Sequence, residues 1–165
     1  MQPNRLTPVI IATVIMVLVS VMPFLNMLCC IGIPLGGFIG VSNLFKQTQK
    51  LNTKFETKDG ILIGVFSGIL AGIIVAGVNL MFTLFTHVNP INEMLDVFSQ
   101  LKLSIDPGVE NYMNKLSSEY SDKGFSPTLT IFQLITNLIF YPLFGMIGAI
   151  LGVSILSKRA KKPTV

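Results

Sequence analysis

The chain has 165 residues, of which 51% are hydrophobic and only 12% are Asp, Glu, Lys or Arg, and its mean hydropathy is +0.70. Soluble domains carry about 25% charged residues to cover their surface, so this composition excludes most soluble classes. A single His and two Cys leave little material for a metal or catalytic centre. The composition predicts an integral membrane protein without a metal or other cofactor.

Three long uncharged runs divide the chain, at residues 6–45, 60–92 and 124–157. A bilayer core of roughly 30 Å needs about 20 helical residues, so the second and third runs each hold one span and the first holds two. We expect the first run to turn near Pro23. The alternative, one long tilted helix, would enclose Pro23 and Pro34, and proline breaks intrahelical hydrogen bonds.

The prediction is therefore an all-α polytopic membrane protein, a four-helix bundle built as two hairpins in one domain that covers residues 1–165. Its four transmembrane helices are expected near residues 8–26, 29–45, 61–85 and 127–156. The loop at residues 86–126 would then connect the third span to the fourth.

The distribution of charge predicts how the spans are oriented. Residues 46–59 carry four lysines against two acids, residues 158–162 carry four basic residues, and residues 86–126 carry six acids against three lysines. By the positive-inside rule, both termini and the 46–59 loop are cytoplasmic in an inner, cytoplasmic membrane, and the 86–126 loop is extracytoplasmic. The net charge of +4 then faces anionic lipid headgroups, so we expect the bilayer as a partner and no nucleic acid.

The outer loop is too long for a structureless connection. Two stretches in it repeat apolar residues at helical spacing, which predicts two short amphipathic helices. The apolar positions are Ile91, Met94, Leu95 and Phe98 in the first and Val109, Tyr112, Met113, Leu116 and Tyr120 in the second. Two interpretations stay open: the stripes lie on the membrane face or cap the bundle, or they dock another protein.

Glycine recurs at steps of four within three of the spans. Steps of four keep these small residues on one helix face, where neighbouring backbones can approach closely in lipid. We predict helix packing, within one chain or between two copies, through Gly32, Gly36 and Gly40, through Gly64, Gly68 and Gly72, and through Gly148 and Gly152 with Gly145 beside them.

Amides are the strongest polar groups inside the predicted spans, which contain no Asp, Glu, Lys, Arg or His. Ionisable residues within a membrane mark proton relays and ion pathways, so their absence argues against a proton-coupled transporter. The amides are Asn79, Gln133 and Asn137. They predict either an interhelical hydrogen bond or a shallow polar site that opens outward.

Two segments of the chain are similar to each other. Residues 34–40 and 142–148 are identical at five of seven positions, and both are predicted to run from outside to inside. A duplicated hairpin would produce this similarity and would relate the two halves by a pseudo-twofold axis along the membrane normal. Chance similarity between two low-complexity membrane segments is the alternative.

Further motifs carry a resemblance to a known family. They are Pro23-Phe24-Leu25-Asn26 followed by Cys29-Cys30 and Gly36-Gly37, then Asp59-Gly60 before the Gly64/Gly68/Gly72 helix, and residues 145–152 before the lysine-rich tail. On these residues the chain resembles small bacterial four-span membrane proteins known only as a domain of unknown function. The resemblance implies the four-span topology and assigns no catalytic residue.

Three classes of function are compatible with the sequence. The leading prediction is a non-enzymatic structural or accessory membrane protein whose glycine faces or outer loop contact a second copy or another protein. The alternative is an oligomeric channel or transporter for small solutes. An enzyme of membrane lipids is disfavoured, because such chemistry needs a positioned nucleophile, base or metal and the loops offer no arrangement of that kind.

Overall fold

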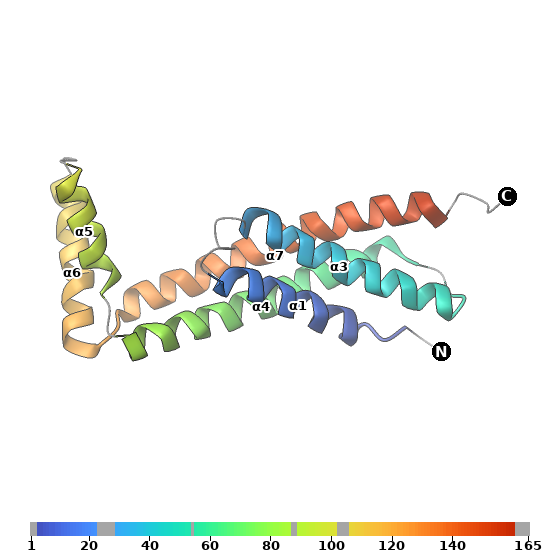
Figure 1. The fold of residues 1–165 in the computed structure, drawn as a ribbon, viewed down its shortest axis with the longest axis horizontal. Coiled ribbons are helices and arrows are strands. Elements are labelled where there is room, and N and C mark those ends of the chain that lie inside the picture. The colour runs from blue at the N-terminus through green and yellow to red at the C-terminus, as the bar shows by residue number, and fades with distance from the viewer. Residues whose placement is uncertain (1–2, 23–28, 54, 87–88, 102–105, 161–165) are drawn as a thin grey trace. The chain divides into compact units, whose positions relative to one another are not determined.

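A computed structural model describes residues 3–22, 29–53, 55–86, 89–101 and 106–160. These residues form six helices and no strand, which confirms the all-α class (Figure 1). The helices are α1 Leu6–Val21, α3 Cys29–Lys50, α4 Thr57–Thr86, α5 Pro90–Gln100, α6 Pro107–Lys123 and α7 Pro127–Ala160. The predicted turn near Pro23 lies outside the described residues.

Two of the described helices, not the predicted four, are long and apolar enough to cross a membrane. These are α4, and α7 over Pro127–Lys158. Helix α1 has 16 residues, which at 1.5 Å each extend about 24 Å and fall short of a bilayer core of roughly 30 Å. Helix α3 has 22 residues, but it contains four glycines and ends in the polar sequence KQTQK. The apolar runs of the sequence are thus longer than some of the helices formed from them.

Capping residues fix where the loop helices begin and end. Asn89 Oδ1 accepts from the Ile91 N–H at 3.1 Å, and Asp106 Oδ1 accepts from the Gly108 N–H at 2.8 Å. Each cap precedes a proline at the first helical position, where no N–H is needed. Helix α6 ends at Lys123 and is capped by Gly124, whose φ of 75° suits glycine and whose N–H donates to the Tyr120 carbonyl.

The described residues fall into two compact units, residues 1–75 with 136–165 and residues 76–135. In the first unit α1 lies against α3 (Figure 1). Its core is formed by two groups of buried residues, Met16, Ile33, Ala71, Val75 and Tyr141, and Val41, Phe45, Ala149, Val153 and Leu156. Helices α1, α3, α4 and α7 therefore all contribute to this core.

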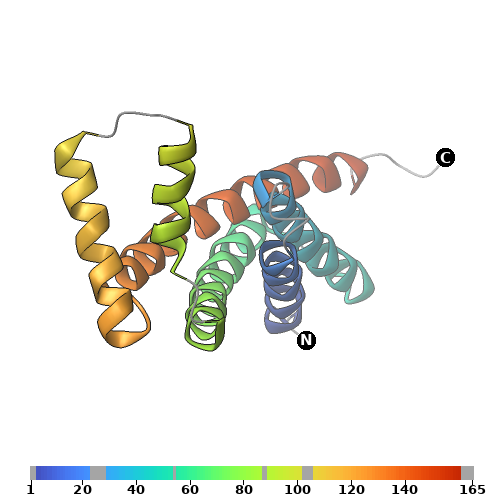
Figure 2. The same ribbon diagram turned by 60° about the vertical axis from the view of Figure 1, so that its left-hand side comes forward.

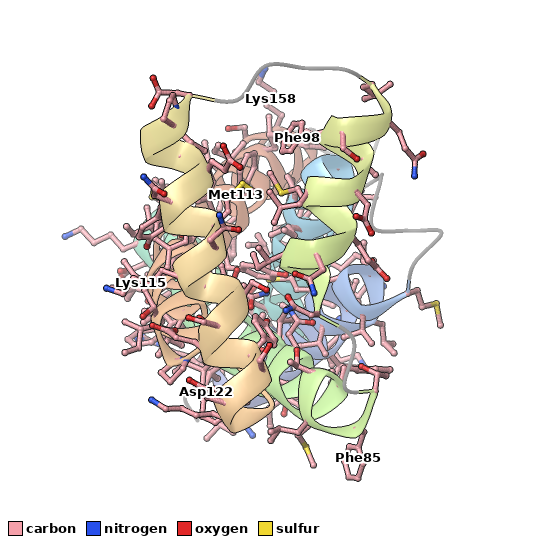
Figure 3. All side chains as sticks on the ribbon, turned by 90° about the vertical axis from the view of Figure 1, so that its left-hand side faces the viewer. Phe85, Phe98, Met113, Lys115, Asp122 and Lys158 are labelled. Carbon is pink, nitrogen blue, oxygen red and sulfur yellow. The ribbon has the colours of Figure 1, made fainter. Side chains whose placement is uncertain are left out.

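In the second unit, α5 and α6 lie side by side as a hairpin (Figure 2). Figure 3 shows Met113 between the two helices and Lys115 on the outer side of α6. The buried residues are Ile91, Met113 and Leu116, with Leu95, Phe98, Tyr120 and Leu129 packed around them. The hairpin thus buries much of both predicted apolar stripes against itself and the start of α7, while Met94, Val109 and Tyr112 stay exposed.

The two similar segments pack against each other in the first unit. Helices α3 and α7 run in the same direction (Figure 1), and the Gly37 position touches the Gly145 carbonyl. Gly37 and Gly145 occupy equivalent positions in the two segments. Val41 and Ala149, the residues that directly follow the two segments, share one buried group. Contact between equivalent residues is what a twofold axis requires where two helices cross. Duplication of a hairpin stays a prediction.

Candidate functional site: a glycine-lined packing face

Glycine lets the backbones of α4 and α7 meet. A Cβ placed on Gly64 would lie 2.5 Å from the Gly145 carbonyl oxygen and 2.6 Å from the Ala149 Cβ. A Cβ on Gly145 would in turn collide with the Gly64 carbonyl oxygen. No larger residue fits at either position without moving a backbone, so this crossing depends on glycine in both helices.

The same face continues along α4. A Cβ on Gly68 would lie 2.5 Å from both the Pro142 Cα and the Tyr141 carbonyl oxygen, and one on Gly72 would lie 3.0 Å from the Asn137 carbonyl oxygen. As α4 advances in steps of four residues, its contacts recede along α7. The two helices are therefore antiparallel along this glycine face.

Helix α3 uses glycine on two sides. Toward α7, a Cβ on Gly37 would collide with the Gly145 carbonyl, one on Gly148 would collide with the Pro34 carbonyl, and one on Gly152 would lie 3.2 Å from the Val41 Cβ. The α1 side consists of Gly32 against Val19, Gly36 against Met16 and Gly40 against Ala12. Sequence reasoning missed Gly37, although the Gly36-Gly37 pair puts glycine on adjacent sides of one helix.

A hydrogen bond between buried hydroxyl groups and backbone joins α1 to α4, and the sequence did not single it out. Thr13 Oγ1 donates to the Ser67 carbonyl oxygen at 3.3 Å, and Ser67 Oγ donates to the Ile63 carbonyl oxygen at 2.7 Å. Both side chains are buried. The sequence feature that could have identified Ser67 is its position next to Gly68, on the small-residue face of α4.

Hydrogen bonding at the predicted intramembrane amides can be described for Asn79 and Asn137. Asn79 is half-buried and its backbone carbonyl accepts from Thr83 Oγ1 at 3.0 Å. In the described part of the chain, no hydrogen bond joins the side chains of Asn79 and Gln133. The Asn137 Nδ2 is buried without a hydrogen-bond partner. An unsatisfied buried donor costs about 1–3 kcal/mol, so the amide nitrogen of Asn137 does not stabilise the bundle.

Replacing this amide is expected to leave the fold intact. Leucine has nearly the same shape as asparagine and no polar group, so Asn137→Leu should leave the free energy of unfolding unchanged or raise it by about 1 kcal/mol. Titration of the detergent-solubilised protein with a denaturing detergent measures this. A loss above about 1 kcal/mol would contradict the prediction, because it would mean that the amide makes a stabilising contact.

A polar junction holds the end of α6 to the start of α7. Glu119 Oε2 accepts from Ser126 Oγ at 2.6 Å, and Glu119 Oε1 accepts from Thr128 Oγ1 at 2.7 Å. Ser126 Oγ also accepts from the Leu129 N–H at 3.1 Å and so caps α7. The hydrogen bonds from Ser126, then from Thr128, lower the pKa of the Glu119 carboxyl below its usual value. This junction anchors the hairpin to the start of α7.

Neither a metal centre nor a known relative provides a further guide to function. Among the residues that the structure describes, no three His, Cys, Asp or Glu side chains gather closely enough to hold a metal ion. Comparison with protein families, with curated proteins and with solved structures finds no match to this chain. Function is therefore inferred from the packing face and the outward surface of the helices.

Proposed function

We propose that the chain is an integral membrane protein in which α1, α3, α4 and α7 form a glycine-packed bundle with a non-enzymatic structural or accessory role. One observation carries this proposal: the apolar surfaces of the long helices point outward. Only 44% of the most apolar part of α4 and 33% of that of α7 are buried. A core helix of a soluble protein would instead be mostly buried, and soluble monomers rarely expose large contiguous apolar patches.

The two faces of α4 differ in the way a lipid environment favours. Large apolar residues are exposed at Leu62, Phe66, Leu70 and Ile73, whereas the face with Gly64 and its successors at steps of four contacts α7. Lipid tails are as apolar as leucine, so large side chains gain nothing by moving inside. Close backbone packing then becomes the stabilising contact, and glycine supplies it.

Exposed apolar residues on the shorter helices α1 and α3 support the inclusion of these two helices in the same membrane bundle. Helix α1 exposes a stripe at steps of four, Leu6, Ile10, Val14 and Leu18, and α3 exposes Ile31 and Leu35. These stripes lie on helices that also contribute to the buried core of the first unit. We infer that α1 and α3 also span the bilayer, with local thinning of the bilayer around the short α1.

The proposed orientation places both termini and the 46–59 loop in the cytoplasm of a cell with an inner membrane. Arg5 and Asp59 form an ion pair at 3.0 Å, which supports a common side for the start of α1 and the start of α4. Lys46, Lys50 and Lys58 lie within the 46–59 segment that ends at Asp59 and are exposed. Basic residues beside span ends favour the cytoplasmic side.

Cysteine accessibility tests both the membrane location and the orientation. In a Cys29→Ser/Cys30→Ser background, a cysteine at Lys115 should react with an impermeant maleimide in intact cells, and one at Lys50 should react only after permeabilisation. The reverse pattern would overturn the orientation. Recovery of the unmodified protein in the soluble fraction after alkaline carbonate treatment would overturn the membrane location.

A second candidate function, an oligomeric channel for small solutes, is favoured by the buried amide of Asn137, whose nitrogen has no partner. A polar group on a pore path would serve conduction rather than stability. Solute efflux from vesicles that contain the protein distinguishes the two functions. Efflux that is lost in Asn137→Leu, while the folded protein is retained, would favour the channel over the structural role.

A further inference from the structure

A polar hollow of about 430 Å³ lies at the C-terminal end of α3. Its lining residues are Asn43, Lys46, Gln47, Gln49 and Lys50. All five side chains are polar, two are cationic and none is acidic. Lys46 and Lys50 are four residues apart, so their ammonium groups extend from the same helix face and repel each other weakly. Two cations and three amides around one hollow suit an anion.

The two lysines have no acidic partner in the described part of the chain. Asp59 pairs with Arg5 at 3.0 Å, and this is the one ion pair among the described residues. Glu56 is exposed and does not line the hollow. The positive charge of Lys46 and Lys50 is therefore available to a ligand.

The C-terminal end of α3 repels a bound anion only weakly. The carbonyl end of a helix carries partial negative charge, which is concentrated on carbonyl oxygens without hydrogen-bond donors. In α3 the carbonyls of Gln47, Thr48 and Gln49 accept from the N–H groups of residues 51, 53 and 52, at 3.0–3.3 Å. These bonds satisfy three of the last carbonyls, so the lysines and amides set the charge of the hollow.

The hollow lies where the apolar part of α3 ends. Leu44 and Phe45 are buried in the first unit, and every residue of α3 after Phe45 is polar. In a bundle that spans a bilayer, this boundary lies at the level of the lipid headgroups, where anionic lipids attract lysine. The phosphate oxygens of such a lipid accept hydrogen bonds from ammonium and amide N–H groups alike.

We propose that this hollow binds the phosphate of an anionic phospholipid headgroup, held by Lys46 and Lys50 and oriented by the amides of Asn43, Gln47 and Gln49. The proposal rests on the proposed membrane function. It adds a specific headgroup site on one helix to the general attraction between basic residues and an anionic leaflet. Phosphate is the shared chemistry of a lipid and of the free ion, and we commit to the lipid because the hollow adjoins the apolar boundary.

Lipid binding to the detergent-solubilised protein tests the proposal, with mixed micelles that contain phosphatidylglycerol or phosphatidylcholine. Native mass spectrometry should detect retained phosphatidylglycerol. The Lys46→Gln/Lys50→Gln variant should lose roughly 30-fold in affinity, equivalent to about 1 kcal/mol for each lysine. The matched Lys58→Gln/Lys158→Gln variant removes the same charge from exposed positions outside the hollow and should retain the affinity of the unmodified protein.

Several outcomes would overturn the site. Equal losses in the two variants would mean diffuse basic charge, and equal retention of phosphatidylcholine would mean that the hollow does not select anionic lipid. Competition by inorganic phosphate that matches the lipid in affinity would identify a site for the free ion.

Two controls accompany these measurements. A Lys46→Arg/Lys50→Arg variant keeps the positive charge and should keep binding the lipid. Thermal unfolding in detergent checks that each variant is folded. Failure of the membrane proposal appears separately, in the carbonate extraction of the unmodified protein.

Discussion

The substitution Ile73→Asp, on the outward face of α4, is expected to reduce stable membrane insertion of this helix about 100-fold. Ile73 lies near the middle of α4 and is 49% exposed. A carboxylate at the centre of a transmembrane helix costs about 2.5–3.5 kcal/mol by insertion scales. At an exposed site in water the same substitution would change stability by only about 0.5 kcal/mol. The size of the effect therefore distinguishes lipid from water around α4.

A control in α6 makes this test specific. Tyr112 is 53% exposed on a helix of the predicted outer loop, so Tyr112→Asp should leave insertion unchanged. In the cysteine background described above, reaction of a cysteine at Lys115 with an impermeant maleimide in intact cells requires that α4 crosses the membrane, so it measures insertion of α4 for both variants. If the cysteine at Lys115 reacted as fully in Ile73→Asp as in Tyr112→Asp, the outward face of α4 would not contact lipid.

Gly68→Leu should destabilise the bundle by about 2–3 kcal/mol. The nearest atoms to a Cβ at this position are backbone atoms of Tyr141 and Pro142, which cannot swing aside as a side chain can. Overpacking typically costs about 1–3 kcal/mol, and the rigid neighbours put this site at the upper end. In lipid, the lost close contact is not offset by a hydrophobic gain.

Gly77 offers the matched control on the same helix. A Cβ on Gly77 would meet nothing within 4 Å, so Gly77→Leu should keep or slightly raise the free energy of unfolding because leucine favours helix more than glycine does. Denaturing-detergent titration compares the two variants. Similar unfolding curves for Gly68→Leu and Gly77→Leu would mean that the crossing of α4 and α7 does not depend on glycine.

The positions of the helices could be predicted from local sequence. Asn89-Pro90 and Asp106-Pro107 begin α5 and α6 because a capping oxygen and a proline act on the backbone of the same few residues. The composition likewise indicates long apolar helices, and α4 and α7 are such helices. The four-span prediction goes beyond these two helices, because an uncharged run does not by itself set how many residues form one helix, and spanning by α1 and α3 stays a proposal.

Contacts between helices depended on residues far apart in the chain. The steps of four identified Gly64 and Gly68 as a packing face, but the spacing could not show that the partner is α7. Likewise, no local pattern predicted that Thr13 would bond to Ser67, 54 residues away, or that the two apolar stripes of the 86–126 loop would bury each other.

The sequence alone therefore determined the helical class, the glycine faces and the segregation of charge, since each follows from composition or from neighbours within about four residues. The tertiary structure decided which atoms each glycine meets, left the Asn137 amide nitrogen without a hydrogen-bond partner and formed the polar hollow on α3. Helix periodicity gives the face on which a residue lies, whereas a contact requires the position of a second helix, which is fixed only when the whole bundle packs.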